Sequence, residues 1–173
     1  MYDVQSDSFV FHKGIGKLYK LNSTWNTEHN IAYAARGKFA LVDDRRGNPN
    51  NFSDGVWQGY WGNDIDIELD LGQPTQVSRL SMRFGQLMRY GILYPRQIEI
   101  GISNDGINYQ PIETIANNID PNTEERSIHD FVAALGISTR YIKVVARNPG
   151  LLPEWHYAKG NKSWLFADEI VVE

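Results

Sequence analysis

Three segments of the chain place aromatic side chains next to polar ones, and this pairing suits one kind of chemistry. A sugar presents a flat apolar C–H face and a rim of hydroxyl groups, so proteins hold it with an exposed ring beside planar polar groups. Trp57 and Trp61 lie in a glycine-rich segment, and His156 directly follows Trp155. Arg89, in a third segment, offers a forked donor for vicinal hydroxyls or a carboxylate. The same rings could instead pack in a hydrophobic core, and the polar groups could form hydrogen bonds within their own loops.

Two more polar residues and three histidines complete the candidate set. Asp54 and Gln58 flank the first tryptophan and could contact a sugar hydroxyl or merely support the loop. The remaining histidines, His12, His29 and His129, show no metal-ligand spacing and are interpreted as surface residues.

An acidic run at residues 64–71 has the residue types of a catalytic pair. The carboxylates alternate with apolar residues, which places them on one face of a strand, at Asp64, Asp66, Glu68 and Asp70. Neighbouring carboxylates on such a face are about 7 Å apart, which overlaps the separations that glycosidases use. An exposed flat face has no cleft to raise one of the two pKa values, so the run is interpreted as a solvated strand face.

Composition excludes several function classes. The 173 residues include no cysteine and carry a net charge of −4, which argues against thiol chemistry, Cys-ligated zinc and general binding of nucleic acid. No apolar run is long enough to span a membrane, and no G-x-S-x-G, P-loop or H-E-x-x-H motif occurs. The chain is therefore not expected to be an enzyme by itself.

The elements that must position these residues are mostly strands. Alternating apolar residues predict strands over 64–71, 77–84, 96–102, 127–132, 139–147 and 164–172, with a tight turn at 103–106. Only weak helical turns are predicted, at 30–35 and 131–135, and residues 72–74 are read as a turn. Many short strands separated by Gly, Asn and Pro indicate an all-β antiparallel sandwich or jelly roll.

The chain divides into a short leader and one module. Residues 1–9 resemble a linker remnant without the features of a signal peptide, and residues 10–173 form the predicted module. Three irregular segments, 43–63, 86–94 and 148–162, interrupt the strands. Long loops on a compact sandwich are where binding is usually found.

Several of these segments resemble a known family. The matching stretches are Ala40-Leu41-Val42-Asp43, Trp57-Gln58-Gly59, Ile67-Glu68-Leu69-Asp70-Leu71-Gly72, Pro95-Arg96-Gln97-Ile98-Glu99-Ile100, Arg140-Tyr141-Ile142-Lys143-Val144 and Trp164-Leu165-Phe166-Ala167-Asp168-Glu169-Ile170. The chain is similar to discoidin domains, also called coagulation factor five/eight type C domains, and most of all to family-32 carbohydrate-binding modules. Pro153-Glu154-Trp155-His156 and the Gly-Asn-Lys-Ser-Trp-Leu-Phe ending resemble the C-terminal modules of β-hexosaminidases (chitobiases) of gut Bacteroides.

The resemblance implies a galactose-binding-domain-like fold and two sites. Its loops gather at one end of the sandwich, which would bring Trp57, Trp61, Arg89, Trp155 and His156 together. It also implies one structural Ca²⁺, held by the side chains of Asp43 and Glu169 with backbone carbonyls. The further ligands would be the carbonyls of Leu41, Arg46 and Ala167, and the side chain of Asn48. Asp44 stands where the family usually has glycine, in a position that Asp tolerates if the backbone is left-handed.

The resemblance therefore implies a non-catalytic carbohydrate-binding module of a secreted glycoside hydrolase. Such a monomeric module would act outside the cytoplasm or at the cell surface and bind terminal galactose or N-acetylhexosamine on glycans. One alternative is a spacer that packs on the parent's catalytic domain and binds nothing, with its tryptophans buried. Another is a phospholipid- or protein-binding discoidin domain, and here the negative charge argues against a membrane surface.

Overall fold

The structure, a computed structural model, describes residues 11–122 and 125–173, so the predicted linker at 1–9 lies outside the described residues. Every strand pairing is antiparallel. The strands are β1 (Leu18–Leu21), β2 (Gln58–Trp61), β3 (Ile65–Leu87), β4 (Gln97–Ser103), β5 (Gln110–Ala116), β6 (Arg126–Ala146) and β7 (Trp164–Val172). Three 3₁₀ turns, η1 (Ile31–Ala34), η2 (Gly37–Phe39) and η3 (Met88–Tyr90), are the only helical elements in the described part of the chain.

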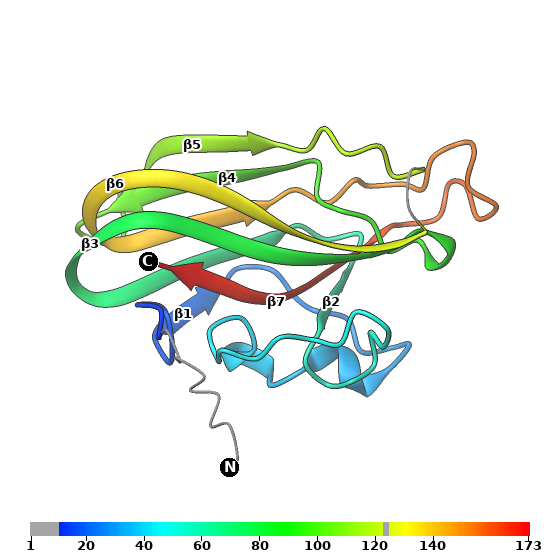
Figure 1. Cartoon of the computed structure of the whole chain (residues 1–173), viewed down its shortest axis with the longest axis horizontal. Coiled ribbons are helices and arrows are strands. Elements are labelled where there is room, and N and C mark those ends of the chain that lie inside the picture. The colour runs from blue at the N-terminus through cyan, green and yellow to red at the C-terminus, as the bar shows by residue number, and fades with distance from the viewer. Residues whose placement is uncertain (1–10, 123–124) are drawn as a thin grey trace, which may run out of the picture.

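Two layers share the long strands β3 and β6, which curl together at the left of Figure 1. One layer has the order β1, the first half of β3, the second half of β6, β4 and β5. The other has the order β2, β7, the second half of β3 and the first half of β6. The predicted antiparallel β-sandwich is confirmed.

The bend in β3 explains why the sequence predicted two strands there. Gly72 has a φ of 88°, and the register with β6 shifts between Asp70 and Thr75. Glycine adopts this backbone conformation without steric cost. The segment at 72–74 is therefore a bulged corner inside one strand, where the sequence predicted a turn between two. The predicted helical turn at 131–135 is wrong, because these residues pair with β3 as part of β6.

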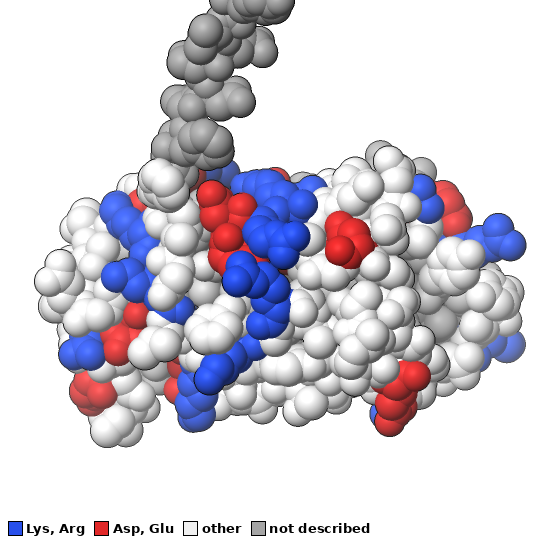
Figure 2. All heavy atoms as spheres, turned by 90° about the horizontal axis from the view of Figure 1, so that it is seen from below, with Lys and Arg blue, Asp and Glu red and all other residues white. Residues whose placement is uncertain are grey.

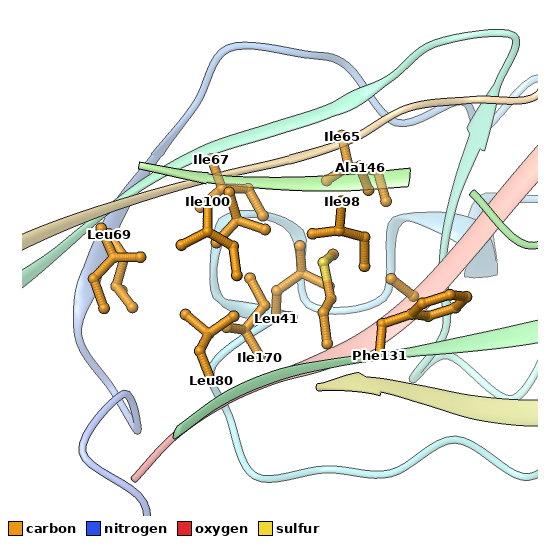
Figure 3. Close-up of a cluster of buried hydrophobic side chains, with 14 of the residues drawn as sticks. Leu41, Ile65, Ile67, Leu69, Leu80, Ile98, Ile100, Phe131, Ala146 and Ile170 are labelled. Atoms are coloured by element: carbon orange, nitrogen blue, oxygen red, sulfur yellow. The ribbon is translucent and has the colours of Figure 1, made fainter. Parts of the chain in front are cut away.

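Alternating side chains from both layers fill the core. Figure 3 shows Ile65, Ile67 and Leu69 pointing toward Leu80 and Ile170 of the facing layer. All five are almost fully buried. A second buried cluster lies toward the loop end and is built mainly from aromatic rings, at Phe52, Trp57, Leu87, Ile92, Trp164 and Phe166. The first cluster holds the layers together, and the second supports the loops.

The outward face of the first layer is the acidic run, and its carboxylates pair with cations. The side chain of Arg147 reaches both Asp64 and Glu99, at 2.9 and 2.5 Å. Lys143 lies 3.3 Å from Asp66, and Arg140 lies 2.9 Å from Asp70. This confirms a solvated strand face, here called the charged face, held by cross-strand ion pairs.

The underside in Figure 1 is covered by β1, η1, η2 and the loops up to β2. Figure 2 shows a band of Lys and Arg across the middle of this side, next to Asp and Glu, and mostly uncharged surface toward the loop end. Asp44 lies in this region with a φ of 57°, the left-handed conformation that Asp tolerates. Among residues 11–122 and 125–173, no helix has the length and apolar character needed to cross a membrane.

Candidate functional site

The end of the sandwich that lies on the right in Figure 1 is the loop end. Its side chains enclose an open hollow of about 400 Å³. Buried apolar side chains form its floor. They are Phe52 from the loop before β2, Leu87 from the end of β3, Ile92 from the loop after η3, and Trp164 and Phe166 from β7. The rings meet edge to face, with Phe52 and Phe166 centroids 5.5 Å apart. This floor is the outer surface of the aromatic cluster, so core packing fixes its shape.

More exposed side chains form the rim of the hollow. Tyr90, at the end of η3, has 63% of its surface exposed, and Tyr33 contacts Phe166 edge to face at 4.8 Å. His29 packs edge-on against both Trp61 and Trp164, with ring centroids 5.3 and 5.4 Å away. The rim thus places rings and an imidazole around an apolar floor.

Polar groups on the other side of the rim come from the loop at residues 48–53 and from the start of β6. The Nη1 atom of Arg126 donates to Oδ1 of Asn50 at 3.1 Å. The Oδ1 atom of Asn51 accepts from the backbone N–H of Ser53 at 3.0 Å, which leaves the Asn51 amide nitrogen as a donor. The Ser53 hydroxyl accepts from Asn30 at 3.0 Å. An apolar floor with a few polar groups around it is the usual build of a small-ligand site.

Two of the predicted ligand residues are buried, which corrects the prediction that they meet a sugar. Trp57 has no exposed surface, and its Nε1 donates to the carbonyl of Asn48 at 3.1 Å. Gln58 is equally buried; its amide donates to the carbonyls of Ala34 and Gly37, and its oxygen accepts from Tyr60. Both residues shape the underside of the hollow and have no free surface for a ligand.

His156 and Asp54 are also occupied within the protein. The Nδ1 atom of His156 accepts from the N–H of Ala158, so Nε2 carries the proton and donates to the carbonyl of Met88 at 2.8 Å. His156 is 4% exposed and fastens its loop to η3, which corrects its predicted ligand role. The Asp54 carboxylate accepts from the backbone N–H groups of Asn48, Val56 and Trp57 and braces the loop.

The other three predicted residues lie at the loop end but do not line the hollow. Trp61 stacks on Trp164 at 6.1 Å and is partly exposed beside the rim. Trp155 is 43% exposed, and Arg89 is exposed on η3. The structure brings Trp61 to the hollow, and the bond between His156 and Met88 brings Trp155 near the turn that carries Arg89.

None of the seven predicted ligand residues is among the described residues that line the hollow. Asn50 and Asn51 lie in a loop that was recognised as irregular, but asparagine is so common in turns that nothing marked them out. Tyr90 directly follows Arg89, but its sequence context does not distinguish an exposed ring from a packed one. Arg126 was missed because it begins a strand whose start is not marked in the sequence.

The predicted calcium ligands fall into two groups. Glu169 is buried; its Oε1 accepts from Nε2 of His12 at 3.0 Å, and its Oε2 has no hydrogen-bond partner among the described residues. His12 is therefore buried, which corrects its interpretation as a surface residue. Burial raises the pKa of Asp43 and of Glu169, and the charge of Asp43 raises the pKa of Glu169 further. The Leu41 carbonyl accepts from the N–H of Ile170, next to Glu169.

The other predicted calcium ligands are the side chain of Asn48 and the carbonyls of Arg46 and Ala167. Both Asn48 oxygens already accept hydrogen bonds, and Ala167 is paired with Gln58 in the sheet. The Arg46 carbonyl stays a predicted ligand, since the ion pair of Arg46 with Asp130 at 3.7 Å involves only the side chain. No group of three or more His, Cys, Asp or Glu side chains suited to a metal occurs in the part of the chain that the structure describes. An uncompensated buried carboxylate oxygen beside a second carboxylate nevertheless fits a hard cation such as Ca²⁺.

A second buried carboxylate lies behind the aromatic cluster. Asp168 pairs with Arg83, whose guanidinium lies 5.2 Å from the Trp57 ring, and accepts from the N–H of Gly47 at 2.7 Å. Burial raises the pKa of Asp168 to about 7, although Gly47 and Arg83 oppose this shift. This ion pair ties β7 and β3 to the loop beneath the hollow.

Solved structures of similar fold include two sugar-binding modules of bacteria and a fish lectin. One is chitosan-binding module 1 of a chitosanase/glucanase from Paenibacillus sp. IK-5, with TM-score 0.55 and 15% identity, covering 94% of this chain and 98% of that one. A second is a fucolectin from striped bass (Morone saxatilis) serum, with TM-score 0.54 and 16% identity over 93% and 47% of the two chains. A third is a fucose binding module of Streptococcus pneumoniae, with TM-score 0.50 and 16% identity over 93% of each chain.

These identities establish likeness of fold alone. None of the curated proteins compared with the chain matches its sequence. The family comparison is more direct, because the model of the F5/8 type C domain matches residues 21–168. That range includes five of the seven strands in whole and parts of β1 and β7, together with every described residue that lines the hollow. The chain belongs to the F5/8 type C, or discoidin, domain family.

Proposed function

We propose that this chain is a carbohydrate-binding module whose ligand site is the loop-end hollow. The observation that carries the proposal is the combination of an apolar aromatic floor with exposed rings and amide groups on its rim. That arrangement complements the C–H face and the hydroxyl rim of a sugar ring. The descriptions of the three similar structures, as chitosan-binding, fucolectin and fucose-binding, support the same ligand class.

The hollow would hold a single terminal sugar weakly. Its volume of about 400 Å³ is at the low end for small-ligand sites, and it is open to solvent. A shallow site buries little area, so we expect dissociation constants from about millimolar to tens of micromolar. Such a module acts by raising the local concentration of a linked catalytic domain at its glycan.

The experiment is a calorimetric titration of the chain with galactose, N-acetylgalactosamine, N-acetylglucosamine and fucose. Tyr90→Ala should weaken binding roughly fivefold to tenfold, because a stacked ring contributes about 1 kcal/mol. Tyr157→Ala is the matched control, since Tyr157 is 79% exposed but does not line the hollow. Equal losses in the two variants would contradict the proposed location. No response to any sugar at tens of millimolar would overturn the function.

The calcium site is also a proposal. The residues that would hold the ion are Asp43 and Glu169, with the Leu41 carbonyl beside them, and the uncompensated Oε2 of Glu169 supports the assignment. A bound cation would neutralise two repelling carboxylates and clamp β7 to the loop after η2. The melting temperature should rise with CaCl₂ and fall in EDTA, and Asp43→Asn should abolish the difference. Identical melting curves in the two solutions would exclude the ion.

The parent protein and its location remain part of the proposal. We propose a secreted glycoside hydrolase of the β-hexosaminidase type, acting outside the cytoplasm. The support is the sequence resemblance in the Pro153–His156 segment and in the Trp164 ending. The polypeptide that carries this module should hydrolyse 4-nitrophenyl N-acetyl-β-glucosaminide, and inactivity on that substrate would remove this assignment.

A further inference from the structure

The charged side chains that line the hollow are of one sign only among the described residues. Among the described residues that line it, none is Asp or Glu, and the cationic side chain is Arg126. His29, on the rim, adds an imidazole that can also become positive. The wall is therefore neutral to positive in a chain whose net charge is −4. The described residues of this wall therefore offer no carboxylate to attract the ammonium group of an amino sugar.

The fold fixes Arg126 at this place. Arg126 begins β6 directly opposite Leu87 of β3, and Leu87 belongs to the floor. Opposite residues of an antiparallel pair put their side chains on the same face of the sheet, so Arg126 stands over the floor. Its Nη1 donates to Oδ1 of Asn50 on the same side of the rim at 3.1 Å, which holds the guanidinium toward the loop.

That geometry leaves donors for a ligand. A guanidinium has five N–H donors in a planar fork, and the bond to Asn50 uses only one of them. The fork matches the two oxygens of a carboxylate or sulfate group, and such charge-assisted pairs are stronger than bonds to neutral hydroxyls. The apolar floor beside it would receive the sugar ring itself.

We propose that this hollow prefers sugars that carry an anionic group and that Arg126 is the specificity-determining residue that binds this group. The inference rests on the proposed function and narrows its ligand class. A carboxylate in a uronic acid and a sulfate ester offer the same chemistry to the guanidinium. Cationic amino sugars should be disfavoured, even though a chitosan-binding module shares the fold.

The test compares four sugars that share one ring: galactose, galacturonic acid, galactose 6-sulfate and galactosamine, each titrated by calorimetry. We expect at least one of the two anionic sugars to bind about fivefold to tenfold more tightly than galactose, and galactosamine to bind more weakly. Tighter binding of the uronic acid identifies a carboxylate ligand, and tighter binding of the sulfate identifies an ester. The preference should shrink when NaCl is raised to about 1 M, because the pair is exposed to screening.

In the variant Arg126→Gln, the anionic sugars should bind no more tightly than galactose binds to that same variant, because the guanidinium that prefers them is gone. The matched control is Arg79→Gln, which removes the same charge at an exposed ion pair with Glu173 and should keep the preference. Equal affinity for galactose and both anionic sugars in the unmodified protein would overturn this inference and leave the proposed function intact. Failure of all four sugars and of the neutral panel would overturn both.

Discussion

The charged face and the loop-end hollow are both rich in groups that could bind something, but they use these groups differently. On the charged face, carboxylates and cations satisfy one another, as when Arg147 joins Asp64 and Glu99. The hydrogen bonds from arginine hold the pKa of Asp70 and of Glu99 below the usual range. At the hollow, apolar rings are stacked into a floor while Tyr90 and Arg126 remain open to solvent. A surface that completes its own interactions is structural, and one that leaves rings and donors exposed can take a ligand.

The tryptophans of the loop end give the largest test of this comparison. Trp57→Ala should lower the free energy of unfolding by about 3 to 5 kcal/mol, because it empties the centre of the aromatic cluster. Trp155→Ala should change it by less than about 0.5 kcal/mol, since that ring is 43% exposed. Urea denaturation of both variants measures the difference. Similar losses would mean that Trp155 is part of the core.

A smaller loss is expected where the backbone passes close under the rings. A β-carbon on Gly85 would lie 2.1 Å from Phe52 and 3.3 Å from Trp57. Gly85→Ala should therefore cost about 1 to 3 kcal/mol through overpacking and distort the floor of the hollow. Gly101→Ala is the milder comparison within the charged layer, because its nearest neighbour, the Gln110 carbonyl oxygen, would be 3.3 Å away and would need to shift only slightly. If Gly85→Ala leaves the free energy of unfolding unchanged, the floor of the hollow can accommodate the extra methyl group.

The pKa values of buried and surface carboxylates in the two regions should be shifted in opposite directions. Burial raises the pKa of Asp168 to about 7, whereas Arg140 lowers the pKa of Asp70. For Asp168 the folded state holds its proton more tightly, so its contribution to stability is complete below about pH 4 and is lost as the pH rises toward 7. Asp70 contributes above its unfolded pKa of about 4, and this contribution is lost as the pH falls through its lowered folded pKa.

Carboxyl-carbon NMR of the folded protein measures these two groups separately. The Asp168 signal should move near neutral pH, well above the range where Asp70 titrates. An Asp168 signal that titrates at or below the ordinary value of about 4 would mean that Arg83 compensates fully for its burial.

The smallest effect is expected on the charged face. Arg147→Ala removes the ion pairs with Asp64 and Glu99, but all three side chains are about one-third exposed. Exposed pairs contribute little, so the loss should be about 1 kcal/mol or less, and glycan affinity should not change. Thermal unfolding and one sugar titration check both points. A loss of affinity in Arg147→Ala would make the charged face part of the binding surface.

Much of the fold could be predicted because the alternation of apolar and polar residues along a strand indicates which side chains are buried. Residues 64–71 show this clearly. Their apolar side chains are buried in the core, and the carboxylates that alternate with them form ion pairs at the surface. The corner at Gly72 was read as a turn because glycine marks a bulge and a turn alike. Phe131–Leu135 has residues that favour a helix, but pairing with β3 overrides that local preference.

The site could be predicted only in outline. A tryptophan that packs a core and one that stacks on a sugar are the same residue type, and nothing near Trp57 in sequence separates the two roles. The partner that occupies His156 is the carbonyl of Met88, 68 positions away along the chain. Arg126 reaches the hollow through its register with Leu87, which is a property of the assembled sheet.

The position of β7 has a consequence for how the molecule is made. This strand is the last in the chain, yet it lies between β2 and β3 in the middle of its layer. While residues 164–172 are still inside the ribosome, β2 has no neighbour and the floor lacks Trp164 and Phe166. The layer must therefore close after synthesis has passed this strand, through contacts between distant parts of the chain, which makes folding slow. The loop-end hollow is consequently among the last features to form, and a nascent chain would need protection from aggregation until then.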